Sequence, residues 1–287
     1  MSLDSIKTIA VAGAGTMGSG IAQLAAQAGY KVVLFDIKNK ALQNAEQSIN
    51  KNTDKGIEKG KLSAGDKERI FKNLVFTSNL NHLNAELVIE AILEKLDPKV
   101  DFFKTMHELN GEHCIFASNT SSIPITKIAA QIPNPERVVG MHFFNPAHIM
   151  KLVEVISGAS TDTEVAETVF QLAEKMGKKP VHAKDAPGFI VNRVARHFYV
   201  ESLKILEEQV TDHQGIDKLL KASGFKMGPF ELMDLIGVDT NFSVTTSMYE
   251  SFHYDDKFRP SRIQEQKVHA GHHGRKSGRG FYDYSGK

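Results

Sequence analysis

Cysteine is almost absent from this chain, with Cys114 the only one among 287 residues. An intrachain disulfide is therefore excluded, and a reducing compartment such as the cytoplasm is the expected location. Cys114 opens a short apolar run that ends at Ala117, so we interpret it as a small buried hydrophobic residue.

Long hydrophobic runs and a one-sided charge are also missing. No apolar run approaches the length of a membrane span, so we expect no membrane association. The net charge is +1, with 35 Lys and Arg against 34 Asp and Glu, which gives no support for a nucleic-acid partner. The first apolar strand begins at Ile6, and we expect no secretory or transit segment before it. We also predict no metal site.

The most informative stretch of the sequence runs from Ile6 to Asp36. An apolar strand is followed by Gly13-Ala14-Gly15-Thr16-Met17-Gly18, an alanine-rich helix, a second apolar strand and Asp36. The first glycine permits a sharp turn, the second lets a pyrophosphate approach the backbone, and the third allows close helix packing. The residues expected to contact a dinucleotide here are Gly13, Ala14, Gly15, Thr16, Met17, Gly18 and Asp36. Because a carboxylate at position 36 would repel a 2′-phosphate, NAD is favoured over NADP.

Alternating strands and helices continue as far as Asp185, and then only helices follow. We predict an α/β fold, with a Rossmann-type, mostly parallel sheet domain over residues 1–185 and an all-α domain over 186–287. The expected strands are 6–12, 32–35, 74–77, 87–91, 114–117, 138–141, 152–156 and 179–183, and the expected helices are 21–28, 38–61 (one or two helices), 63–72, 98–109, 163–176, 189–208, 216–223, 230–236 and 261–270.

His142 and Glu154 are the strongest candidates for acid–base chemistry. Glu154 shares a strand face with Leu152 and Ile156, where a carboxylate is costly without a partner. His142 lies on the preceding strand, and a pair with Glu154 would fix the imidazole tautomer. From these residues alone, a catalytic pair and a purely structural pair are equally well supported.

Two further clusters have alternative interpretations. The small polar run from Ser118 to Ser122 follows a strand and could either orient a ligand or form an ordinary turn. Lys51, Lys55 and Lys59 share one helix face, which could be a solvated surface or a docking stripe for an anionic group such as a nucleotide phosphate.

Taken together, these segments resemble the short-chain L-3-hydroxyacyl-CoA dehydrogenases, which include the bacterial 3-hydroxybutyryl-CoA dehydrogenases. Besides the glycine loop, the matching segments are Ala117–Ser122, Gly140–Pro146, Met150–Val155, Pro187–Arg193, Met227–Leu232 and Lys276–Tyr282. They follow the family order over nearly the whole chain. One departure is Ala147-His148-Ile149, where the family usually has a proline near His148.

The resemblance implies roles for individual residues. It implies that His142 is the catalytic base, that Glu154 is its partner, and that Ser121 and Asn192 hold the substrate near its reacting carbon. Cofactor contacts are implied for Asp36, Glu94, Lys99, Ser121, Asn145 and Lys276, and contact with the CoA moiety for the helix that carries Lys55 and Lys59.

The expected function is reversible hydride transfer between NAD and the 3-hydroxyl carbon of a short-chain (S)-3-hydroxyacyl-CoA. The resemblance also implies a homodimer or higher homo-oligomer formed by the helical domain, and a place in fatty-acid (lipid) or butanoate metabolism. Two alternatives stay open at this point. One is a dehydrogenase of a free 3-hydroxy acid, and the other is a non-catalytic NAD-binding structural protein of the same fold.

Overall fold

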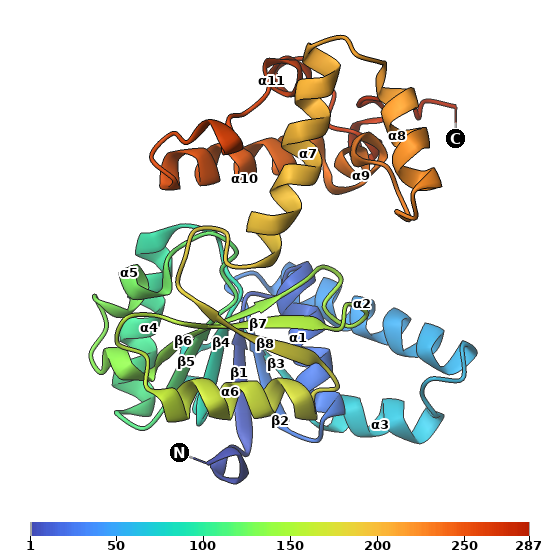
Figure 1. The fold of residues 1–287 in the computed structure, drawn as a ribbon. Helices are drawn as coiled ribbons and strands as arrows, with labels where there is room; N and C mark the ends of the chain where they lie inside the picture. Colours follow the sequence, from blue (N-terminus) through green and yellow to red (C-terminus); the bar gives the residue numbers. More distant parts are fainter. Residues whose placement is uncertain (1, 287) are drawn as a thin grey trace. The chain divides into compact units, whose positions relative to one another are not determined.

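The computed structural model describes residues 2–286 and divides the chain into two compact units, Met1–Ala186 and Pro187–Lys287 (Figure 1). The predicted domain boundary, between residues 185 and 186, lies one residue before this division. Each unit is described by itself below.

The first unit is built on one sheet whose strands lie in the order β3-β2-β1-β4-β5-β6-β7-β8. Pairing is parallel except between β6 and β7, which are antiparallel. The predicted Rossmann-type, mostly parallel sheet is therefore confirmed. The strands are β1 (Thr8–Ala12), β2 (Lys31–Phe35), β3 (Leu74–Thr77), β4 (Leu87–Glu90), β5 (Ile115–Ser118), β6 (Val138–Phe143), β7 (Leu152–Ser157) and β8 (Lys179–Lys184).

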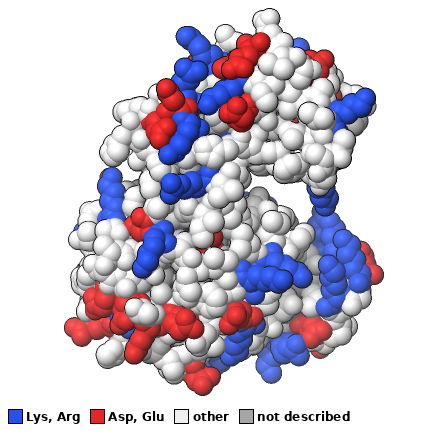
Figure 2. All heavy atoms as spheres, viewed as in Figure 1, with Lys and Arg blue, Asp and Glu red and all other residues white. Residues whose placement is uncertain are grey.

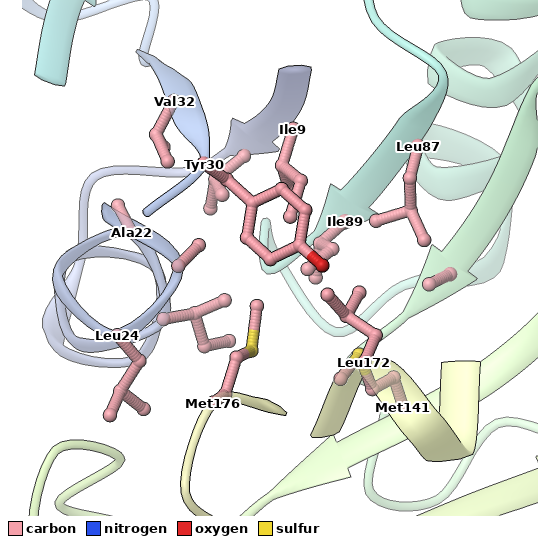
Figure 3. Close-up of a cluster of buried hydrophobic side chains, with 14 of the residues drawn as sticks. Ile9, Ala22, Leu24, Tyr30, Val32, Leu87, Ile89, Met141, Leu172 and Met176 are labelled. Carbon is pink, nitrogen blue, oxygen red and sulfur yellow. The ribbon is translucent and has the colours of Figure 1, made fainter. Parts of the chain in front are cut away.

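Helices cover both faces of this sheet, as expected for parallel strands joined by crossovers. Figure 3 shows one face, where Ile9, Ile89 and Met141 of the strands meet Ala22 of α1 and Leu172 of α6. The opposite face packs against α4 and α5. The helices are α1 (Thr16–Gln27), α2 (Asn39–Glu58), α3 (Ala64–Lys72), α4 (Leu96–Asn110), α5 (Ile125–Ala129) and α6 (Thr163–Lys175).

Local sequence explains where several of these helices begin and end. Ser63 and Asp66 form a reciprocal capping box at the start of α3, which satisfies two backbone donors that the helix leaves open. Gly29 follows α1 at a φ of 96°, a conformation that glycine adopts without strain. The sequence predicted a break within residues 38–61 as one possibility, but α2 is a single helix.

The second unit is all helical, as predicted. Its core is formed by Tyr199, Leu203, Phe230 and Met233, with Phe281 from the final segment. The carboxylate of Asp234 accepts hydrogen bonds from the backbone N–H groups of Phe281 and Tyr282 at 2.9 Å each, which fixes that segment. The helices are α7 (Val191–Glu207), α8 (His213–Ala222), α9 (Pro229–Ile236), α10 (Val238–Ser251) and α11 (Arg262–His269).

In the part of the chain that the structure describes, no helix has the length and apolar character needed to span a bilayer.

Candidate active site

The glycine loop, Gly13–Gly18, joins β1 to α1 at the carboxyl end of the sheet. Gly13 has a φ of 96°, and a Cβ there would lie 2.4 Å from the Ala91 carbonyl oxygen. A Cβ at Gly18 would lie 1.7 Å from the Gly13 oxygen. Both positions therefore exclude any side chain for reasons of packing within the unit.

Gly15 differs, because no atom lies within 4 Å of the position where its Cβ would be. It precedes α1 directly, so the first backbone N–H groups of the helix and its positive dipole end lie beside this open space. These features fit a pyrophosphate, and the loop residues Ala14, Thr16 and Met17 form the rest of the turn.

Asp36 follows β2 and reaches the same loop. One carboxylate oxygen accepts a hydrogen bond from the Ala14 N–H at 2.9 Å, and the other accepts from the Lys38 N–H at 2.9 Å. The carboxylate therefore lies where the sequence places it, at the end of the second strand and against the glycine loop. A negative charge in this position is compatible with ribose hydroxyls and unfavourable for a 2′-phosphate.

His142 and Glu154 face each other across the antiparallel pair of β6 and β7, where they are register partners. The Nδ1 atom of His142 lies 2.7 Å from a Glu154 carboxylate oxygen, and the two residues are 6% and 1% exposed. Because a carboxylate only accepts hydrogen bonds, Nδ1 carries a proton and is the donor of this hydrogen bond. The ring of Phe144 lies against the imidazole, with centroids 4.5 Å apart. The pair that the sequence predicted is thus present, with a fixed tautomer.

A buried polar network lies beside this pair at the ends of β4 and β5. Lys99 of α4 is 1% exposed, and its ammonium contacts Glu90 at 2.5 Å and Glu94 at 3.1 Å. Glu90 is 0% exposed and also accepts a hydrogen bond from the Ser118 hydroxyl at 2.7 Å. The Lys99 ammonium therefore supports these two carboxylates, and its cofactor contact stays a prediction.

Glu94 joins this network to Ser121. One of its oxygens accepts from the Thr120 hydroxyl at 2.6 Å and from the Ser121 N–H at 2.9 Å. Burial alone would raise the pKa of Glu94, but the charge of Lys99 and these hydrogen bonds outweigh it and lower the pKa. Glu94 is therefore a stable carboxylate that fixes the backbone of the predicted substrate-binding serine.

The remaining predicted site residues are placed as follows. Asn145 is exposed in the loop after β6. In the helical unit, Asn192 lies in the first turn of α7, and Lys276 forms an ion pair with Asp239 at 2.7 Å. The sequence analysis did not single out Asn119, whose side-chain oxygen accepts from the Phe143 N–H at 2.9 Å and so ties the β5 end to the β6 end. Its position in the polar run after β5 was the one available signal.

Lys55 and Lys59 line a cavity of about 430 Å³ in the first unit. Lys61, Lys151 and Lys178 line it too, and no Asp or Glu occurs among its lining residues in the described part of the chain. Figure 2 shows blue Lys and Arg side chains gathered over the region of α2. The lysine stripe therefore faces a concave, cationic site and not only open solvent.

The doubly wound sheet, the open glycine turn and the His–carboxylate pair at one sheet edge define an NAD-dependent dehydrogenase fold. Comparisons with known proteins agree. Residues 8–186 match the model for "3-hydroxyacyl-CoA dehydrogenase, NAD binding domain". Residues 188–284 match "3-hydroxyacyl-CoA dehydrogenase, C-terminal domain". The chain belongs to the 3-hydroxyacyl-CoA dehydrogenase family, as its motifs predicted, and its cofactor is NAD.

Individual relatives are similar over nearly the whole chain. The chain is 47% identical to a 3-hydroxyadipyl-CoA dehydrogenase of Escherichia coli (strain K12), covering 98% of this chain and 59% of the relative. It is 39% identical to a 3-hydroxybutyryl-CoA dehydrogenase of Clostridioides difficile, covering 96% and 99%. The crystal structure of an (S)-3-hydroxybutyryl-CoA dehydrogenase from Ralstonia eutropha superimposes with a TM-score of 0.94 at 40% identity, covering 98% and 99%.

Proposed function

We propose that this protein catalyses the reversible transfer of a hydride between NAD and the 3-hydroxyl carbon of a short-chain (S)-3-hydroxyacyl-CoA. The observation that carries the proposal is the register pairing of His142 with Glu154 at the sheet edge that also carries the glycine loop. A scaffold that only held NAD would not need a buried, tautomer-fixed imidazole there.

In the oxidative direction, His142 accepts the proton of the 3-hydroxyl. Its Nδ1 is committed to Glu154, so the proton transfer falls to Nε2. Glu154 stabilises the imidazolium that forms and keeps the ring in place. Bound NAD supplies the hydride acceptor. In the reductive direction the same imidazolium returns the proton to the new alkoxide oxygen.

Ser121 and Asn192 orient the substrate oxygens so that C3 presents its hydrogen to the cofactor. Positioning of this kind is a large part of such catalysis. Ser121 has a fixed backbone through its N–H bond to Glu94. We assign Lys276, Asn145 and Asp36 to cofactor contact, with Asp239 holding the Lys276 ammonium.

The lysine-lined cavity favours an acyl-CoA over a free 3-hydroxy acid. A free acid carries one carboxylate, whereas coenzyme A carries several phosphate charges that can occupy a cavity with five lysines and, among residues 2–286, no lining carboxylate. We place the CoA moiety there, with Lys55 and Lys59 as its direct contacts.

An NADH-oxidation assay tests the substrate class. Acetoacetyl-CoA should be reduced with a kcat/KM at least about 100-fold above that for acetoacetate, because phosphate and pantetheine contacts contribute binding energy that the free acid lacks. NADPH should be a poor substitute because Asp36 repels its 2′-phosphate. Equal rates with acetoacetate and acetoacetyl-CoA would contradict the proposal. The same assay with acyl-CoA substrates of increasing length measures the preference for acyl-chain length.

We further propose that the helical unit forms a homodimer in the cytoplasm. Several large apolar side chains of that unit are exposed, among them Val194 and Leu219 at 70% and Phe225 at 51%. A second copy of the chain that covered these side chains would remove their apolar surface from water. Sedimentation equilibrium of the whole chain should give twice the mass of one chain, and a monomer at micromolar concentration would contradict it.

A further inference from the structure

The loop between β6 and β7 holds His148 in a fixed position. Ala147 is 1% exposed, and an added Cβ at Gly20 of α1 would lie 3.0 Å from its side chain. The ammonium of Lys178 donates hydrogen bonds to the carbonyl oxygens of Ala147 at 2.5 Å and Met150 at 2.8 Å. The backbone on both sides of His148 is therefore tied to neighbouring elements.

His148 lines the same cationic cavity as the lysines. The charged groups that line it come from four segments, namely Lys55 and Lys59 of α2 and its end, Lys61 after α2, Lys151 before β7 and Lys178 before β8. No carboxylate lines the cavity in residues 2–286. The imidazole is thus placed among positive charges that an anionic ligand would neutralise.

This environment disfavours the charged imidazole in the free protein. Burial lowers the pKa of His148 from its ordinary value, and the charges of Lys178 and Lys55 lower it further. A bound polyphosphate would oppose the second cause directly, since a nearby anion stabilises the imidazolium. Ligand binding and proton uptake at His148 are therefore thermodynamically linked.

We propose that His148 is a specificity residue for the phosphate groups of coenzyme A, taking up a proton when they enter the cationic cavity and so tightening acyl-CoA binding at lower pH. This inference rests on the proposed function, because it takes the CoA moiety as the ligand of the cavity. The added charge acts on the ligand phosphates, and the effect belongs to affinity, while proton transfer at C3 remains with His142.

Calorimetric titration of the whole protein with free CoA tests the proposal. Titrations at about pH 6.5, where histidine ordinarily titrates, are run in two buffers of different ionisation enthalpy. The difference in apparent binding enthalpy gives the number of protons taken up. His148→Gln should take up fewer protons than the unmodified chain, and its Kd should be about threefold weaker at pH 6 and unchanged at about pH 8.5, as for a partly exposed charge pair.

Three controls isolate the imidazole. The 3′-phosphate of CoA itself titrates near pH 6 and would release protons among the lysines. The net proton exchange measured with His148→Gln defines that background, and dephospho-CoA removes it. His182→Gln, an exposed histidine on β8 outside the cavity, should behave as the unmodified chain does. His148→Lys carries a permanent charge, and its CoA affinity should remain strong while losing the part of the pH dependence that His148 contributes.

The outcomes separate this inference from the proposed function. Proton uptake that is equal in the unmodified chain and in His148→Gln overturns the role of His148, whether or not acetoacetyl-CoA is turned over. Uptake that is smaller in His148→Gln than in the unmodified chain supports it. In that case, a failure to reduce acetoacetyl-CoA would contradict only the proposed reaction.

Discussion

Charged groups in the first unit are buried only where other groups compensate them. Glu154 meets the imidazole of His142, and Glu90 meets the Lys99 ammonium and the Ser118 hydroxyl. Desolvating a charge is costly, and the remaining partner of a broken pair keeps that cost. Each of these carboxylates is therefore held by the network around it, which also fixes the residues at the sheet edge.

Lys99→Met tests this view of the residue-scale network. It leaves two carboxylates without their cation, and we expect the free energy of unfolding to fall by about 3–5 kcal/mol. Urea denaturation gives the value, and Lys104→Met, an exposed lysine on the same helix, is the matched control. A loss no greater than that of the control would show that the pair contributes no stability, and a direct cofactor contact would then become the better role for Lys99.

At the scale of elements, the β6–β7 hairpin and the glycine turn have different roles. The antiparallel register places His142 opposite Glu154, and a shift of one residue would turn the two side chains to opposite faces. The glycine turn instead leaves open space for a ligand beside Gly15, because the other two glycines, Gly13 and Gly18, are closely packed.

Gly15→Ala therefore separates folding from cofactor binding. Its φ of −72° suits alanine, so thermal stability should change little, while the added methyl group occupies the space assigned to the pyrophosphate. We expect the Kd for NADH, measured by fluorescence titration, to rise at least about tenfold, equivalent to about 1.4 kcal/mol. Unchanged NADH affinity would mean that the pyrophosphate lies elsewhere. Gly18→Ala, in contrast, should destabilise the unit itself.

The elements that the sequence predicted are those with a strong periodic pattern. All eight strands were found, and all except β8 (Lys179–Lys184) are short apolar runs bounded by turn residues. Helix α10 was missed, since Val238–Ser251 is rich in Ser, Thr and Val, which favour helices weakly. Tertiary packing overrides this preference, because Val238, Asn241, Thr245 and Met248 are buried along one helix face. The five-residue helix α5 was too short to leave a periodic signal.

The candidate site was predictable only where one segment or one motif contains it. The glycine loop and Asp36 are local, and the His142–Glu154 pair spans two successive strands. The contacts of Lys99 and Lys178 could not be anticipated, because their partners lie on other elements and depend on how α4 and β8 pack. The spacing of lysines on α2 predicted a cationic helix face. The cavity was not predictable, because Lys151 and Lys178 from distant segments also line it.

At the scale of the whole molecule, two units with separate cores contribute to one proposed reaction. In the proposed function, the acid–base pair and the NAD-binding turn belong to the sheet unit, and Asn192 and Lys276 belong to the helical unit. The order of motifs along the chain made this division predictable, since βα alternation ends where the helices begin. Oligomer size was not predictable, because one chain's sequence does not show which exposed apolar side chains a second copy covers.

The most direct test of the account is the turnover of acetoacetyl-CoA with NADH by His142→Gln in the otherwise unchanged chain. We expect kcat to fall by about 10²- to 10⁴-fold, the usual contribution of a positioned general acid or base, with the Kd for NADH unaltered. Glu154→Gln should also lower kcat, since it removes the carboxylate that stabilises the imidazolium. A His142→Gln variant that binds NADH normally and retains near-normal turnover would contradict the central claim.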